Sequence, residues 1–208
     1  MQAPKVTLAI LAGLIVPGAD LAAEPSTEKC ELHVSATGQS GAQVQRMARA
    51  PGDPDLPNTI ASRLKNFLDA ESQINTFKKV DLEKYFPISR YDIKYEPAMS
   101  IDKYRSLIKS NSRAYLSNSY CYIEIIFAGN GYVDRDFDSR RLYSAITVRK
   151  FTGKSLRKTE KSMIDPLNYV DDMYFSGNIA GIDKEISDSF FNNVSEFSSE
   201  IQSWIRKY

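Results

Sequence analysis

The stretch YCYIEIIF, residues 120–127, decides the fold of this chain. Tyr and Ile are typical strand residues, and the alternate positions form one apolar face, which predicts a core on that side. The residues of that face are Cys121, Ile123, Ile125 and Phe127. We expect a strand over residues 114–128 and a second one over residues 142–151, LYSAITVRKF. The polar connection between them, residues 129–141, predicts an antiparallel hairpin.

The N-terminus predicts an export signal. Lys5 precedes an apolar run from Val6 to Val16, and the small residues Ala22 and Ala23 follow a Pro-Gly break. The run is too short to span a bilayer, which is typical of a cleaved signal peptide over residues 1–23. The remaining residues, 24–208, have the length of a single domain.

Cys30 and Cys121 are the only cysteines in the sequence. In an exported chain of this size they are expected to form a disulfide. Apolar and polar residues alternate over residues 30–35, which predicts a half-buried strand with His33 on the face away from Cys30. His33 is then expected to be a surface or strand-edge imidazole. A bond to Cys121 requires this strand to lie beside the strand over residues 120–127.

The rest of the chain predicts helices around this sheet. Helical spacing and cap residues indicate helices near residues 57–79, 100–109 and 179–207, and a strand over residues 88–95. Residues 36–57 and 152–178 are expected to be long loops. The expected fold is an α/β (α+β) sandwich with a mostly antiparallel sheet, packed by helices and carrying one disulfide.

Charge and ligand chemistry exclude several classes of function. The net charge of +1 gives no support for nucleic-acid binding, which draws on a surplus of Lys and Arg. One His and two paired Cys do not supply a zinc site. The carboxylates of DRDFD, residues 134–138, start like a calcium loop, but Ser139 and Ala145 replace its turn glycine and bidentate glutamate. We therefore expect no metal, no cofactor and no assigned catalytic residue.

Glu124 is the carboxylate that carries most interest, because it stands on a strongly apolar strand. Arg149 on the next strand could pair with it across the hairpin. One interpretation is a cross-strand ion pair on a half-exposed face, which contributes under about 1 kcal/mol. The other is a buried acid with a raised pKa in a tyrosine-lined cleft, which would suit acid-base chemistry.

The run Cys30-Glu31-Leu32-His33-Val34 after a signal peptide resembles the start of small exported proteins of alphaproteobacteria. A tryptophan often follows this strand in those proteins, where this chain has Ser35. The order of elements is also similar to the amino-terminal domain of the Tol-Pal protein TolB and to curli-secretion and penicillin-binding-protein activator lipoproteins. This resemblance implies a non-catalytic periplasmic binding or assembly domain and no particular site residues.

The sequence therefore favours a periplasmic or secreted accessory protein that binds an envelope protein or an envelope polymer. A hydrolase using a carboxylate such as Glu124 and a small-ligand carrier are the alternatives. No transmembrane segment is expected in the mature chain, and the oligomeric state stays open. Contacts are expected on the two long loops, because binding residues concentrate on loops held by a rigid scaffold.

Overall fold

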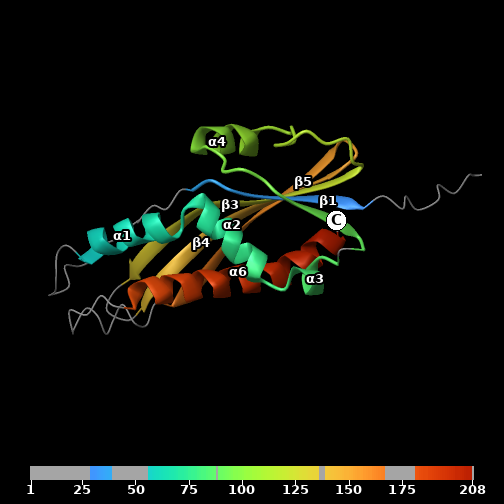
Figure 1. The fold of residues 1–208 in the computed structure, drawn as a ribbon. Helices are drawn as coiled ribbons and strands as arrows, with labels where there is room; N and C mark the ends of the chain where they lie inside the picture. Colours follow the sequence, from blue (N-terminus) through green and yellow to red (C-terminus); the bar gives the residue numbers. More distant parts are fainter. Residues whose placement is uncertain (1–28, 39–55, 88, 136–138, 167–180, 208) are drawn as a thin grey trace, which may run out of the picture.

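A mixed five-stranded sheet in the order β2-β1-β3-β4-β5 organises the chain (Figure 1). This computed structural model describes residues 29–38, 56–87, 89–135, 139–166 and 181–207. The strands are β1 (Cys30–Ala36), β2 (Tyr91–Tyr95), β3 (Cys121–Arg135), β4 (Ser139–Thr152) and β5 (Ser155–Pro166). β1 runs parallel to β2 and β3, whereas the longer β3–β4 and β4–β5 ladders are antiparallel. The expected α+β fold is confirmed.

Helices cover both faces of the sheet. They are α1 (Leu56–Phe67), α2 (Ala70–Lys79), α3 (Leu82–Tyr85), α4 (Ile101–Lys109) and α6 (Ile182–Lys207). Figure 1 shows α1, α2, α3 and α6 on one side of the sheet and α4 on the other. Within the described residues, no helix is both long and apolar enough to cross a membrane.

The main core lies between the sheet and α6. Alternate residues of β1, β3 and β4 face it, and the apolar stripe of α6 fills it from the other side. The rings of Phe77, Phe127 and Phe190 meet edge to face at 5.5 and 5.9 Å between centroids. Each fully buried side chain of this kind stabilises the fold by roughly 1.5–3 kcal/mol relative to exposure.

The disulfide between Cys30 and Cys121 is present and joins the neighbouring strands β1 and β3. Its sulfur atoms are 1.98 Å apart and the two Cα atoms 4.6 Å apart. The prediction that the first strand lies within disulfide reach of the strand over residues 120–127 is confirmed. The alternation over residues 30–35 correctly predicted that Cys30 lies on the buried face of its strand.

The single helix expected over residues 57–79 is two helices. α1 closes with a bond from the Leu68 N–H to the Leu64 carbonyl, at 2.8 Å. The carboxylate of Asp69 then accepts a bond from the N–H of Ser72 at 2.7 Å and starts α2. The break arises because Asp69 is a strong N-cap residue. The apolar spacing continues across this break, so the pattern predicted one helix.

Two expected connections are strands. β3 and β4 remain paired through most of residues 129–141, with a register shift between Phe127 and Gly129. Residues 152–178 were expected to be a loop, yet β5 follows β4 through a two-residue turn in which Gly153 has a φ of +58°. β5 is an edge strand in which only Met163 is buried among the described side chains, so an apolar alternation was not needed to form it.

The remaining elements follow the expectation more closely. Ser100 caps α4, as its position predicted, by accepting a bond from the N–H of Lys103 at 3.2 Å. The strand expected over residues 88–95 begins at Tyr91. Residues 114–120, expected to start the central strand, are irregular. Several expected features lie outside the described residues: the signal peptide over residues 1–23, most of the loop over residues 36–57, residues 136–138 and residues 167–178.

Candidate functional site

The second face of the central strands is buried and polar. His33 is 2% exposed, and Glu124 and Arg149 are fully buried. The half-exposed face and the surface imidazole expected from the sequence are therefore wrong. The face is covered by α4 and by residues 110–120, which we name the strap because they run across it before β3 begins.

Glu124 and Arg149 bind the backbone of the strap. They stand opposite each other in the β3–β4 register, with 2.6 Å between Arg149 Nη1 and Glu124 Oε2. The other oxygen of Glu124 accepts the N–H of Ala114 at 2.5 Å. Nη2 of Arg149 donates to the carbonyls of Ser110 and Ser112, at 3.0 and 2.8 Å. The ion pair thus supplies hydrogen-bond partners to a segment that has no ladder of its own.

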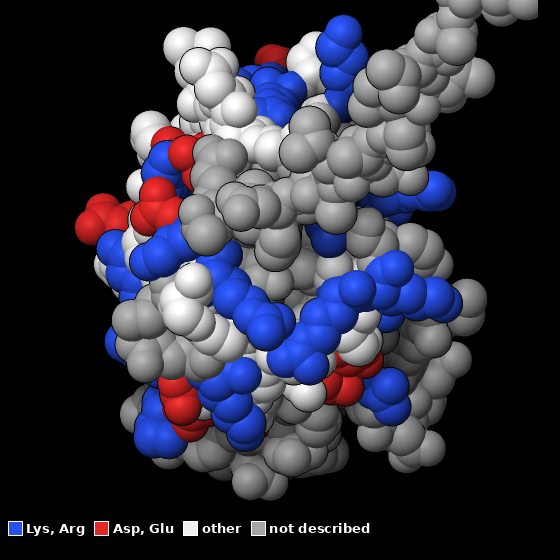
Figure 2. Space-filling view, turned by 90° about the vertical axis from the view of Figure 1, so that its right-hand side faces the viewer, with Lys and Arg blue, Asp and Glu red and all other residues white. Residues whose placement is uncertain are grey.

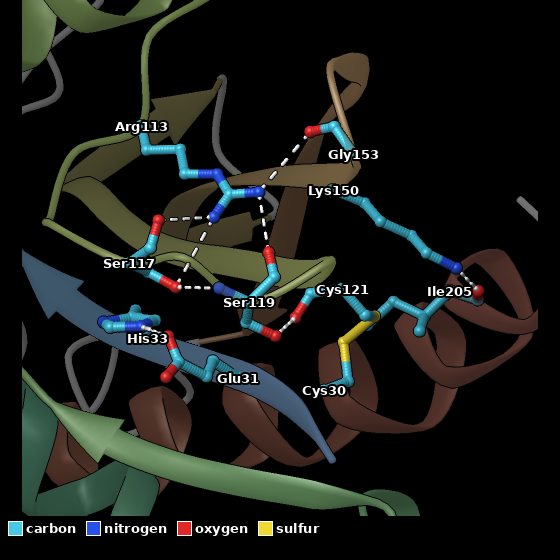
Figure 3. Close-up of a disulfide and its surroundings, with 10 residues drawn as sticks. All are labelled: Cys30, Glu31, His33, Arg113, Ser117, Ser119, Cys121, Lys150, Gly153 and Ile205. Atoms are coloured by element: carbon cyan, nitrogen blue, oxygen red, sulfur yellow. Dashed lines mark hydrogen bonds and ion pairs between the residues drawn. A yellow bond between two sulfur atoms is a disulfide. The ribbon is translucent and has the colours of Figure 1, made fainter. Parts of the chain in front are cut away.

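Arg113 fixes the second half of the strap (Figure 3). Its guanidinium donates to the carbonyls of Ser117 and Ser119 at 2.8 Å each, and to the carbonyl of Gly153 at 3.4 Å. The same group lies 4.8 Å from the ring centroid of Tyr122. Arg113 therefore folds the strap around its own side chain and ties it to the β4–β5 turn.

A second charged cluster joins the strap to β1 and β2. The carboxylate of Glu31 accepts bonds from Lys94 Nζ at 2.6 Å and His33 Nε2 at 3.1 Å, and it also bonds the hydroxyl of Ser117. Burial acts to raise the pKa of Glu31, but these hydrogen bonds outweigh it and lower the pKa to about 2. Glu96 faces the other ring nitrogen of His33, Nδ1, at 2.5 Å.

Tyrosines enclose this cluster. His33 lies between Tyr115, whose ring is stacked at 5.7 Å, and Tyr122 at 4.5 Å between centroids. The hydroxyl of Tyr122 accepts the N–H of Tyr115 at 3.2 Å. Burial raises the pKa of Tyr122, and the Glu124 carboxylate raises it further, so this phenol stays protonated and neutral.

The buried polar side chains around Glu124 bind the backbone of the strap. Both oxygens of Glu124 are engaged and its side chain is 1% exposed, so a substrate has no access to them. In the part of the chain that the structure describes, no group of three or more His, Cys, Asp or Glu is placed to hold a metal ion. The cluster holds the strap in one conformation instead.

The strap presents apolar side chains outward. Leu116 has a relative exposure of 103%, and Tyr120 is 61% exposed. The ring of Tyr120 lies over the β4–β5 turn, where a Cβ on Gly153 would be 3.2 Å from it. The Gly153 N–H also bonds the carbonyl of Tyr120 at 2.8 Å. Leu116 and Tyr120 are therefore the exposed apolar side chains of the candidate site.

Sequence reasoning located part of this site. It singled out Glu124 and Arg149, which the structure brings together, and Cys30 and Cys121, which fix β1 beside β3. It missed Arg113 and assigned Leu116 to a strand. The one available signal was the run of small polar residues over 110–119, which is typical of an irregular segment.

Comparisons with known proteins give distant likenesses only. No protein-family model and no curated protein matches the chain. A hypothetical protein from Chlamydia trachomatis is 8% identical, with a TM-score of 0.41 over 87% of this chain and 100% of that one. A Xanthomonas campestris protein of the DUF330 family is also 8% identical, with a TM-score of 0.38 over 87% of each chain. The PelC dodecamer from Paraburkholderia phytofirmans gives 10% identity and a TM-score of 0.29, covering 80% of this chain and 86% of that one.

These values carry no conclusion about function. The resemblance of the sequence to alphaproteobacterial exported proteins and to the TolB amino-terminal domain stays a prediction.

Proposed function

We propose that this chain is a non-catalytic, exported accessory protein of the cell envelope that binds another protein through the strap. The observation that carries the proposal is the full exposure of Leu116 on a segment whose backbone is held by buried side chains. Burying one leucine in a partner contributes roughly 1.5–3 kcal/mol, and the exposed Tyr120 at the end of the strap adds an aromatic anchor.

The fixed conformation of the strap supports binding. Association normally costs free energy because loops and side chains become ordered at the interface. Here Arg113, Glu124 and Arg149 have already ordered the strap in the free protein. Leu116 favours a protein partner over a sugar polymer because, unlike Tyr120, it offers neither a stacking face nor a hydrogen bond.

The disulfide supports export. Disulfides form and persist in oxidising compartments such as the bacterial periplasm, and the bond between Cys30 and Cys121 closes a long segment of chain. Together with the export signal expected over residues 1–23, it favours a periplasmic or secreted location.

Site-specific photocrosslinking in the cells that make the protein tests this function. Benzoylphenylalanine replaces Leu116 in one variant and Glu196 in a control, because Glu196 is exposed on α6 across the sheet from the strap. We expect one discrete protein adduct from position 116 and none from position 196. The purified partner should then bind the parent chain at least tenfold more tightly than a Leu116→Asp variant.

Two results would overturn the proposal. One is the same adducts from both positions, which would indicate random collisions. The other is a partner that binds Leu116→Asp as tightly as the parent. No observation favours the hydrolase that the sequence left open, because the carboxylate of Glu124 is buried and bound on both oxygens.

A further inference from the structure

Basic side chains gather at the end of the molecule where β1 and β2 begin and α6 ends. Lys29 directly precedes Cys30 at the start of β1. The Cys30 N–H bonds the carbonyl of Arg90 at 2.9 Å, so the backbones of Lys29 and Arg90 lie close together. Figure 2 views the molecule from this end, with Lys and Arg side chains running across the middle of the face and Asp and Glu side chains beside them.

The end of α6 adds to this group. Lys150 donates to the carbonyl of Ile205 at 2.8 Å and holds the last turn of α6 next to the sheet (Figure 3). Burial raises the pKa of Tyr91, and the positive charges of Arg206 and Arg90 both act against that rise.

Lys84 on α3 completes the group. Gln202, one turn before Arg206 on α6, donates to the carbonyl of Tyr85 at 2.8 Å and so joins α3 to this part of α6. We name Lys29, Lys84, Arg90 and Arg206 the basic end. All four are exposed, and none forms an ion pair with a residue that the structure describes.

We propose that the basic end docks the protein on an anionic phospholipid membrane surface. Four exposed like charges held close together repel one another, and mobile anionic headgroups relieve that repulsion. The net charge of the whole chain is only +1, so the local surplus comes from how the charges are distributed.

The residue types favour a membrane over a protein partner. Lys, which supplies two of the four charges, is depleted at protein interfaces, whereas it contributes to binding at anionic membrane surfaces, where Tyr and Trp are also common. The basic end has this composition, since Tyr85, Tyr91 and Trp204 lie along it and are partly buried against the core. Its long side chains, which form no ion pair within the described part of the chain, also suit a diffuse surface better than one discrete ligand.

Vesicle sedimentation of the purified, oxidised protein tests this inference. We expect binding to vesicles that contain phosphatidylglycerol, weaker binding at high salt, and none to phosphatidylcholine alone. Neutralising two residues in Arg90→Gln/Arg206→Gln should lower the partition coefficient by roughly 25-fold, because each basic residue contributes about fivefold near an anionic surface. The matched control is Lys65→Gln/Lys184→Gln, at the far end of the molecule where Arg63 and Asp183 pair.

Urea unfolding of both double variants establishes that each is folded, so a loss of binding can be assigned to charge. Equal binding of Arg90→Gln/Arg206→Gln and the parent would overturn the inference, as would equal binding to both vesicle types. Absence of vesicle binding, with a photocrosslink from position 116 that the Arg90→Gln/Arg206→Gln variant loses, would assign the basic end to the protein interface instead. Because the proposed protein contact uses Leu116 and Tyr120, either proposal can fail while the other stands.

Discussion

Glu124 and Arg149 are buried under the strap, and all of their charged-group atoms except Nε of Arg149 have hydrogen-bond partners among the described residues. A buried ion pair repays its desolvation only if its remaining donors and acceptors are satisfied. Here one Glu124 oxygen binds Arg149 and the other binds the strap backbone, and Arg149 reaches two further carbonyls. At this scale the burial of the pair is explained by the segment that it holds.

Breaking this pair should be costly. Arg149→Met leaves the Glu124 carboxylate buried without its partner, and we expect a loss of about 3–5 kcal/mol in the free energy of unfolding. The double variant Glu124→Leu/Arg149→Met should lose less than the sum of the two single variants, because neither charge is then left alone. Urea unfolding of all four proteins measures the cycle, and additive losses would show that the two charges do not interact.

Glu31 should make stability depend on pH. Its folded-state pKa is about 2, below the ordinary value of 4.5. Between these values the unfolded chain binds more protons than the folded one, so this contribution is complete above pH 4.5 and is lost as the pH falls toward 2. Glu31→Gln should flatten the fall in urea midpoint across this window, whereas Glu196→Gln on the exposed face of α6 should leave it unchanged. An unchanged slope in Glu31→Gln would contradict the assignment.

At the scale of single residues, the sequence predicted faces better than surroundings. The alternation of apolar and polar residues correctly predicted that His33 and Glu124 lie on the face of their strands opposite the disulfide. Burial of that face depends on the strap, whose bonds join residues far apart in the sequence, such as Arg113 and Gly153, which are 40 positions apart. No local pattern encodes such a contact, so a buried polar face was taken for a half-exposed one.

Among the elements, the break between α1 and α2 rests on one side chain. Asp69 caps α2 through the N–H of Ser72. Asp69→Ala should therefore reduce the free energy of unfolding by about 1 kcal/mol, and Asp69→Ser should retain most of it because Ser is also a good cap. Chemical denaturation of both variants provides the measurement. Equal losses in the two variants would show that the cap is not what matters at Asp69.

The elements that sequence reasoning missed share a physical cause. β5 and the outer half of the β3–β4 hairpin are held mainly by backbone ladders, which place few demands on side-chain hydrophobicity. α6 was predicted well because its stability depends on one long apolar stripe packed against the core. Patterns therefore predicted the elements that bury side chains and failed for those held by hydrogen bonds.

The whole molecule has two unequal faces. The face under α1, α2 and α6 carries the large apolar core, whereas the face under α4 and the strap has a small cluster around Met99, Leu107 and Ile126 together with charged groups. Local stability follows buried apolar contacts, so the strap and α4 should form the less stable unit of the fold.

Native-state hydrogen exchange should resolve these two units. The amides of Ala114 and Tyr115 are bonded to the side chains of Glu124 and Tyr122, so they should exchange through a local opening that depends little on urea. The amide of Ile125 in the central strand β3 should exchange only by global unfolding, with a steep dependence on urea. Arg113→Met should speed exchange in the strap and leave Ile125 unchanged, because Arg113 bonds the strap and the β4–β5 turn. Equal opening free energies for the strap and for β3 would contradict this prediction, because the two faces would then unfold as one unit and the strap would have no separate local opening.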